Sequence, residues 1–304
     1  MFGIITAFAI IFVVIGAGYL LSRVGVIAGE KERDVINRVA FYAAVPALVF
    51  SAVADTELEE LISPVVGVSF LAMVVTAVLY ILLSLLFLRR DIPTTAAGAG
   101  ASVYTNTVNI GLPVMVYVIG NSTYMAPIMV IQIVFFTPIL LAGLAAGGVS
   151  LPQLLKRSLL SPIVLASGAG ILVALSPWEV PQPILEPFNI LGGAAVPLVL
   201  MAFGASLSST RVLESKVDRP SVLTASAVKL IGMPLIAYGL GLAFGLAAEQ
   251  LYAVVILATL PSAQNVYNFA ATYGRGEIVA RDTVFITTFA ALPVMLGIAL
   301  LFGR

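Results

Sequence analysis

The chain alternates between long apolar stretches and short polar connections. Cutting it at charged and turn-forming residues leaves ten mostly apolar segments, and a helix needs about 20 such residues to cross a bilayer. The pattern therefore predicts an all-α integral membrane protein with ten transmembrane helices, called spans 1 to 10 below. These spans cover residues 2–21, 35–54, 62–88, 95–118, 124–147, 158–176, 184–207, 221–246, 250–273 and 279–302.

The composition agrees with a membrane location. Hydrophobic residues make up 61% of the 304 residues and charged residues 10%, against about 25% charged in a soluble protein. The mean hydropathy is +1.11, so we expect the lipid bilayer to be the main partner. The net charge of zero gives no indication of nucleic-acid binding.

Cysteine and histidine are both absent. Their absence removes disulfides, thiolate and imidazole metal sites, and every catalytic triad that needs a histidine base. Serine and lysine chemistry remains for an intramembrane enzyme, but no paired arrangement of these residues stands out. We therefore expect a protein that is not an enzyme, with no metal site and no cofactor.

Basic residues are distributed unevenly over the connections. Thirteen of the 15 Lys and Arg residues fall after spans 1, 3, 5, 7 and 9, and none falls after spans 2, 4, 6 or 8. Basic connections stay on the cytoplasmic side of a membrane. The alternation predicts an even number of spans in a cell membrane, with both termini outside. The two remaining basic residues are Lys229, inside span 8, and Arg304.

The two halves of the chain look like copies of each other. Ala43-Ala44-Val45-Pro46 in span 2 matches Ala194-Ala195-Val196-Pro197 in span 7, at an offset of 151 residues. Spans 5 and 10 match at an offset of 155, which pairs Pro138 with Pro293 and Gln132 with Thr287. A copy of five spans must enter the membrane from the opposite side. The matches predict a 5+5 inverted repeat, 1–147 and 148–304, of the kind found in secondary transporters.

Polar residues gather inside spans 4 and 9, where unpaired polar groups are costly. Span 4 carries the stretch 102–113, which reads SVYTNTVNIGLP, and span 9 carries the stretch 259–268, which reads TLPSAQNVYN. Pro113 and Pro261 have no backbone N–H, and Gly111 lets the backbone leave helical geometry. We expect the carbonyls of Asn109 and Leu257 to lose their helical donors, so that both spans become broken helices.

Broken helices inside a membrane offer free N–H groups, a positive dipole end and free carbonyls. Amide side chains beside them can donate or accept hydrogen bonds as a ligand requires. If the two breaks cross near the bilayer centre, they form a site for a small polar or anionic ligand. The alternative is that the amides only hold helices together and hydrogen-bond to the backbone groups that the kinks leave free. The amides in question are Asn106, Asn109, Gln264, Asn265 and Asn268.

Lys229 is the one ionisable residue well inside a span, about 13 Å beyond Pro220 at 1.5 Å per residue. A charge at that depth is expensive and marks a functional site by default. It could neutralise freed carbonyls, pair with an anionic substrate or replace a coupling cation. Alternatively, its long side chain could extend to the inner interface. Gln132 is a further candidate, and no Asp or Glu lies equally deep.

Several local motifs resemble the auxin efflux carrier family, which includes plant auxin carriers and bacterial malonate or malate permeases. Span 4 contains Asn109-x-Gly111-x-Pro113, and span 2 runs from Asn37 to Pro46-Ala47-Leu48-Val49-Phe50. Gly18-Tyr19-Leu20 before a basic turn, Ser161-Pro162 and Pro261 also fit this family. The resemblance covers essentially the whole chain. The chain lacks the long central loop of many plant carriers, so it resembles the compact, prokaryotic type of the family. This difference places auxin itself in doubt as the substrate.

The resemblance implies a scaffold built from spans 1, 2, 6 and 7 that forms a homodimer. It also implies a transport domain from spans 3–5 and 8–10, in which spans 4 and 9 cross. The crossing would bind an organic carboxylate through Asn109, Pro113 and Pro261, with Gln264 and Asn265 beside the second break. The function implied is secondary transport of a small organic anion by an elevator-like or rocking motion.

Two other functions stay open on the sequence alone. A sodium-coupled symporter like those for bile acids shares the 5+5 plan, and amides and carbonyls can bind Na⁺. The coupling ion, Na⁺ or H⁺, is not determined by the residues. A membrane receptor could keep the site without transporting, but no attached soluble domain is evident.

Overall fold

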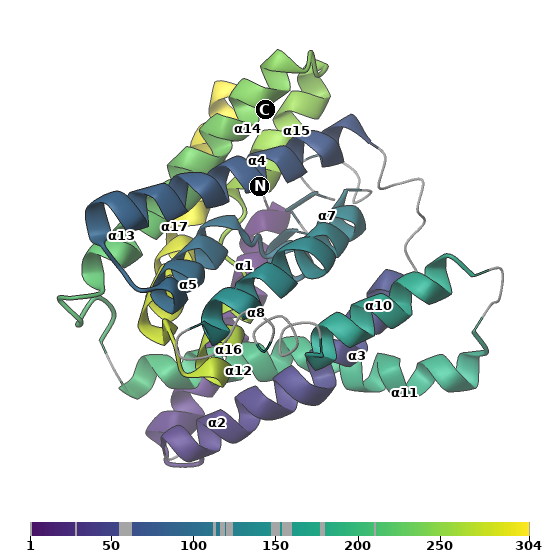
Figure 1. Ribbon diagram of the computed structural model, residues 1–304, viewed down its shortest axis with the longest axis vertical. Helices are drawn as coiled ribbons and strands as arrows, with labels where there is room; N and C mark the ends of the chain where they lie inside the picture. The colour runs from purple at the N-terminus through teal and green to yellow at the C-terminus, as the bar shows by residue number, and fades with distance from the viewer. Residues whose placement is uncertain are drawn as a thin grey trace.

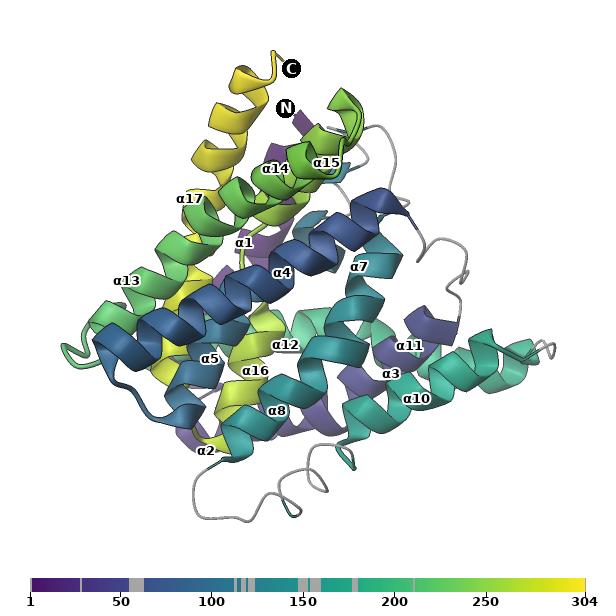
Figure 2. The same cartoon turned by 45° about the horizontal axis from the view of Figure 1, so that its top comes forward.

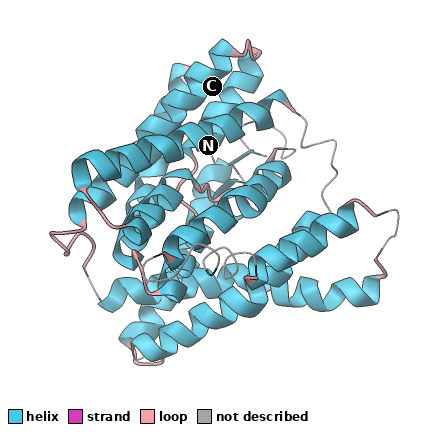
Figure 3. Cartoon of the chain, in the orientation of Figure 1, coloured by secondary structure: helices cyan, strands magenta, loops and turns pink. Residues whose placement is uncertain are grey.

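The computed structural model describes residues 2–27, 29–54, 63–111, 114–115, 119, 124–146, 153, 160–176, 180–209 and 211–303. Within these ranges the regular structure is helical, and no strand is present (Figure 3). The described residues form one isolated antiparallel β-bridge, between Thr105 and Ser262. Six helical stretches are long and apolar enough to cross a membrane: Lys31–Ser51, Pro64–Leu88, Pro127–Ala145, Gln182–Ser208, Arg219–Ala243 and Glu277–Leu301. They coincide with predicted spans 2, 3, 5, 7, 8 and 10 and support a multi-pass membrane protein.

The helices of the first half are α1 (Phe2–Arg23), α2 (Glu30–Val39), α3 (Val45–Ala54), α4 (Pro64–Leu83), α5 (Ile92–Val103), α7 (Met125–Ile131) and α8 (Thr137–Ala145). The second half contains α10 (Pro162–Ala174), α11 (Gln182–Gly193), α12 (Ala195–Ser209), α13 (Arg219–Ala227), α14 (Met233–Ala243), α15 (Ala248–Thr259), α16 (Gln264–Tyr273) and α17 (Glu277–Leu301). Five described π-helical segments adjoin them: η1 (Ala40–Ala44), η3 (Ser84–Leu88), η4 (Thr107–Gly111), η6 (Gln132–Phe136) and η7 (Val228–Gly232).

Three helices begin at a polar capping residue with a proline in the first turn. The Ser63 hydroxyl accepts a hydrogen bond from the Val66 N–H at the start of α4, and Ser161 does the same for Val164 at the start of α10. The Asp91 carboxylate caps α5 in this way. A capping oxygen satisfies one of the N–H groups that a helix start leaves free, and proline there loses no hydrogen bond. Asp91 therefore sets the start of α5 three residues before the predicted span 4.

The three segments η1, η6 and η7 share a local cause. Each ends two residues before a proline, which is Pro46, Pro138 or Pro234. A proline inside a helix cannot donate to the carbonyl four residues earlier, and its ring pushes that carbonyl away. The helix widens by one residue per turn instead of stopping. Gln132 and Lys229 lie in two of these widened turns, and such turns are frequent at functional sites.

The helices pack in two groups. One group pairs α1 with α12 and places α3 against α10 and α11; the other packs α4 against α5, α14 and α15, and α5 against α8 and α17. Figures 1 and 2 both show α2, α3, α10 and α11 below and α4, α13, α14 and α15 above. Helix α16 lies between the groups, since it contacts α2 and α12 on one side and α5, α8 and α17 on the other.

Two glycines let α1 and α12 approach closely. A side-chain carbon on Gly18 would collide with the backbone of Met201, and one on Gly204 would collide with the Ile15 carbonyl. Helix pairs in membranes gain stability from such close backbone packing. The α1–α12 pair therefore depends on the absence of side chains at these two positions.

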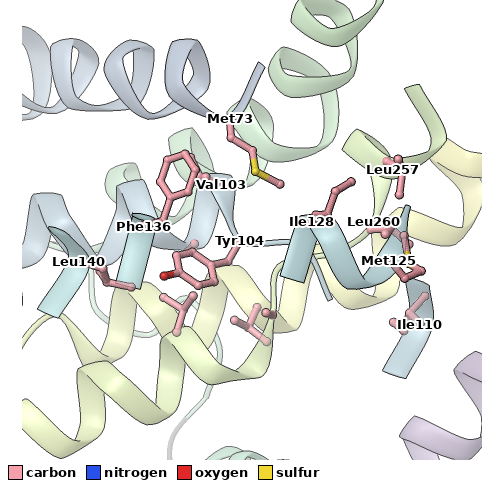
Figure 4. Packing of buried hydrophobic residues seen from close by; sticks show 14 of the residues in the cluster. Met73, Val103, Tyr104, Ile110, Met125, Ile128, Phe136, Leu140, Leu257 and Leu260 are labelled. Carbon is pink, nitrogen blue, oxygen red and sulfur yellow. The ribbon is translucent and has the colours of Figure 1, made fainter. Parts of the chain in front are cut away.

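The core between the groups is densely filled around the Thr105–Ser262 bridge. Figure 4 shows Tyr104 beside Val103, Phe136 and Leu140, with Ile128 on its other side. These residues are at most 8% exposed and belong to one continuous apolar cluster. The polar groups described next therefore lie in apolar surroundings, where each hydrogen bond matters more than it would at a surface.

Candidate functional site

Two helical interruptions lie side by side in the core. Helix α5 ends at Val103 and η4 begins at Thr107, while α15 ends at Thr259 and α16 begins at Gln264. The first interruption is extended at Tyr104 (φ −64°, ψ 125°) and the second at Leu260 (φ −52°, ψ 138°). Both lie within the polar stretches of the sequence, 102–113 and 259–268.

The two interruptions pair through their backbones as a minimal antiparallel bridge. The Asn106 N–H donates to the Pro261 carbonyl at 2.9 Å, and the Ala263 N–H donates to the Tyr104 carbonyl at 3.2 Å. These two bonds flank the directly opposed residues Thr105 and Ser262. In such a pair, the N–H groups of the opposed residues point away from each other and need other partners.

Side chains from two other helices satisfy those N–H groups. The Thr105 N–H donates to Gln132 Oε1 at 2.8 Å, and the Ser262 N–H donates to Thr287 Oγ1 at 3.1 Å. Gln132 also donates from Nε2 to Thr105 Oγ1 at 3.1 Å. Gln132 and Thr287 are the residues that the sequence matches at an offset of 155. They hold equivalent backbone positions on the two sides of the bridge.

A cavity of about 60 Å³ lies beside this bridge, with room for a few water-sized molecules. Its apolar wall comes from α3 and α12, through Val45, Leu48, Val49, Ala195, Val196 and Val199. Its polar wall comes from the interruptions and the chain around η6, through Tyr104, Thr105, Asn106, Thr107, Met129, Gln132, Ile133, Ala263, Gln264 and Asn265. The cavity therefore lies where the two helix groups meet.

Hydrogen-bond donors gather at the polar wall. Asn106 Nδ2 donates to Gln264 Oε1 at 2.9 Å, which leaves Gln264 Nε2 buried without a hydrogen-bond partner among the described residues. Helix α16 begins at Gln264, and its capping position is Ala263, whose side chain accepts no hydrogen bond. The first N–H groups of a helix lack intrahelical acceptors and carry the positive end of its dipole. The chemical complement of this wall is an acceptor with negative charge, such as a carboxylate.

Four of the ten predicted site residues line the cavity, namely Asn106, Gln132, Gln264 and Asn265. Asn109 lies in η4, but its side chain is outside the described part of the chain, and so is Pro113. The other four are Gly111, Pro261, Asn268 and Lys229, and none of them is among the residues that line it.

Gly111 and Pro261 shape the backbone without lining the cavity. The Gly111 N–H donates to the Asn106 carbonyl at 2.8 Å, and a side-chain carbon there would lie 2.9 Å from Met125 Sδ. The Pro261 carbonyl accepts the bond from Asn106 described above. The expectation that Leu257 keeps a free carbonyl is wrong, because this carbonyl accepts from the Leu260 N–H at 3.3 Å in a tightened last turn of α15.

Asn268 lies one turn beyond Gln264 on α16 and contacts α2 instead of the cavity. Its Nδ2 donates to the carbonyl and to Oδ1 of Asn37, at 3.1 and 3.0 Å. A nearby ion pair, between Arg33 and Glu277 at 3.5 Å, joins α2 to the start of α17. These polar contacts link α2 to the second helix group beside the cavity.

Lys229 is completely buried, and its Nζ lies 3.2 Å from Met233 Sδ, one turn further along the span. Because the side chain is completely buried, the amine does not extend to the surface of the protein. Met233 in turn lines a narrow crevice with Thr105 and Leu257, next to the interruptions. The Lys229 amine therefore lies close to the bridge but outside the cavity.

Several residues that form the site are not among those predicted from the sequence. Tyr104, Thr105 and Thr107 belong to the polar stretch of span 4, and Thr287 was matched to Gln132 without being named as a site residue. The apolar wall follows the repeated Ala-Ala-Val-Pro motif, since Val45, Ala195 and Val196 belong to it. That repetition was the signal that could have identified the wall.

Comparisons with known proteins identify the family of this chain. The model of a family described as "Membrane transport protein" matches residues 3–146 and 148–299. A Rhizobium meliloti protein named "Putative malonate transporter" is 30% identical over 306 residues, covering 94% of this chain and 92% of that protein. An "Uncharacterized transporter" of Methanothermobacter thermautotrophicus is 26% identical over 289 residues, covering 93% of both chains. The chain therefore belongs to the membrane transport protein family, that of the auxin efflux carriers.

Proposed function

We propose that this protein is a secondary transporter that carries a small organic anion across a cell membrane by alternating access. The observation that carries the proposal is the unpaired Gln264 Nε2 in the wall of the cavity, at the first residue of α16. An unpaired buried donor is costly. A carboxylate oxygen at this point would satisfy it and would meet the positive end of the helix.

A short dicarboxylate is the substrate class that we propose first. The cavity is small, and its polar wall carries amide and hydroxyl groups without a lining Lys or Arg among the described residues. The name of the Rhizobium meliloti relative points to malonate. We extend that substrate to this chain as part of the proposal.

We further propose that the two interruptions are the broken crossing helices of a ten-helix, 5+5 inverted repeat made of 1–147 and 148–304. The equivalent roles of Gln132 and Thr287 at the bridge support this arrangement. In this proposal, the helices around α1, α3, α10 and α12 form the scaffold of a homodimer, and the remainder forms the moving transport domain. Both termini lie outside the cell, as the distribution of basic residues predicts.

Lys229 has a supporting role in this proposal. When it is protonated, the Lys229 amine favours negative charge in its vicinity without contacting the cavity. Protonation of Lys229 on anion binding would supply locally the positive charge that a coupling cation would otherwise bring. A transporter of this kind would bind its anion equally well in Na⁺ and K⁺ buffers, whereas a sodium-coupled symporter would not.

The test is thermal stability of the purified protein with a panel of mono- and dicarboxylates, in Na⁺ and K⁺ buffers. A ligand at about 100 times its dissociation constant stabilises a protein by roughly 2.7 kcal/mol, which is a measurable shift. In Gln264→Met the dissociation constant should rise by about 10- to 150-fold, because a hydrogen bond to a charged group contributes about 1.5–3 kcal/mol.

Gln182→Met is the matched control, because Gln182 is exposed at the start of α11 and does not line the cavity. It should bind like the unmodified protein. Equal binding by the Gln264 and Gln182 variants would contradict the site. A shift that requires Na⁺ would instead support the sodium-coupled alternative.

A further inference from the structure

A second cavity, of about 280 Å³, opens between α4, α5 and α8. Its lining is almost entirely apolar. Residues on its rim are exposed although they are large and hydrophobic, including Ile81, Leu85, Ile92 and Ile139. Exposed apolar side chains on membrane-spanning helices face the lipid, so this groove opens towards the acyl chains of the bilayer.

Small residues make the groove deep. Ala96, Ala99, Gly100 and Gly143 lie along its floor. At Gly143 an added side-chain carbon would collide with Ala96, and at Gly100 it would lie 2.9 Å from Leu140 Cδ1. Helices α5 and α8 therefore touch along this floor and leave an open channel above it.

The groove has the length of one lipid leaflet. It extends along α5 from Ile92 to Tyr104, which is about 18 Å at 1.5 Å per residue. Half of a bilayer core of about 30 Å is about 15 Å. An acyl chain that enters at Ile92 would therefore end near Tyr104, at the level of the bridge.

A positive charge lies at the end of the groove that is nearest the membrane surface. Arg89 is exposed in the turn between η3 and α5, with no hydrogen bond or ion pair among the described residues. Its neighbour Arg90, by contrast, is held by Asp218. Rim residues Leu85 and Ile92 flank the turn, so Arg89 lies at the end of the groove where the headgroup of a bound lipid would lie.

We propose that this groove binds a phospholipid with an anionic headgroup, one acyl chain filling the groove and the phosphate meeting Arg89. The inference rests on the membrane placement of α4, α5 and α8 and is independent of which substrate is transported. The chain end would contact Tyr104, which also lines the central cavity. Tyr104 is anchored there by its hydroxyl, 3.0 Å from the Gln132 carbonyl and 2.7 Å from Thr137 Oγ1.

The test is photolabelling of the full chain in phosphatidylcholine vesicles. The probe is a phosphatidylglycerol that carries a photoactivatable group at the end of one acyl chain. Peptide mapping should find the label near residues 100–104, and a phosphatidylcholine probe should label this stretch several-fold less. Even labelling over all lipid-facing helices, or equal labelling by both probes, would overturn the proposal, because it would show only the surrounding bulk lipid.

Variants make the test specific to the groove. Ala77→Phe places a ring in the groove and should lower the labelling at least fivefold, whereas Val78→Phe, on the adjacent lipid-facing position of α4, should leave it unchanged. If Ala77→Phe does not fold, Ile139→Trp fills the groove from α8. Arg89→Gln should remove the preference for phosphatidylglycerol. Labelling that persists in the filled variants would refute the site.

Discussion

Thr287→Val isolates the contribution of one hydrogen bond to the bridge. Valine has nearly the shape of threonine, so the change removes the hydroxyl that accepts from the Ser262 N–H at 3.1 Å and creates no cavity. Ser262 and Thr287 are both completely buried, so no bulk water replaces the lost acceptor. An orphaned buried N–H costs about 1–3 kcal/mol. We therefore expect the unfolding equilibrium to shift by about 5- to 150-fold towards the unfolded state.

The neighbouring residue provides the control. Thr288 is equally buried, but its hydroxyl donates only to the Val284 carbonyl within its own helix, at 2.6 Å. Thr288→Val leaves no backbone N–H without a partner, and such local back-bonds add little to helix stability. We expect a change below about 0.5 kcal/mol.

The assay is reversible unfolding of the purified variants in detergent micelles by denaturant titration, followed by carboxylate binding. Thr287→Val should also bind its anion more weakly, because the Ser262 backbone helps to fix the start of α16 at the cavity. A Thr287→Val protein that is no less stable than Thr288→Val would contradict this role of the Thr287 hydroxyl.

Three further substitutions test the roles of Gln132, of Lys229 and of the contact between α1 and α12. Gln132→Met should destabilise the protein by about 1–3 kcal/mol through the orphaned Thr105 N–H, and it should weaken anion binding; unchanged unfolding and binding would contradict this role. Lys229→Met should raise thermal stability, because it removes a buried polar amine, while it weakens anion affinity; unchanged affinity would limit Lys229 to a structural role. Gly18→Ala should lower thermal stability, since its side chain collides with α12, whereas Gly16→Ala, which has open space around it, should be neutral or stabilising. Equal melting temperatures for the two glycine variants would disprove the close α1–α12 packing.

The sequence was informative about the regions that form the site. Polar residues in an apolar span are rare, so the two clusters in spans 4 and 9 stood out, and Asn106, Gln264 and Asn265 line the cavity. The internal match also paired Gln132 with Thr287, which hold equivalent backbone groups. These signals survive because a membrane makes every buried polar group costly.

The sequence could not determine which way each helix faces. Membrane helices are apolar on all sides, so periodicity does not distinguish a side that lines a cavity from one that faces lipid. Asn268 looked like a site residue because it follows Gln264 by one turn, but the neighbour that it meets there is Asn37 on α2. The direction of the Lys229 side chain was undetermined for the same reason, because it depends on how the neighbouring helices pack.

The central claim is that the cavity beside the Thr105–Ser262 bridge carries an organic anion across the membrane. Its most direct test is counterflow in proteoliposomes that are preloaded with unlabelled malonate and supplied with labelled malonate outside. We expect transient accumulation of label by the unmodified protein and by Gln182→Met, and little accumulation by Gln264→Met at the same external concentration. Equal accumulation by all three proteins, or none above protein-free vesicles for any mono- or dicarboxylate tested, would contradict it.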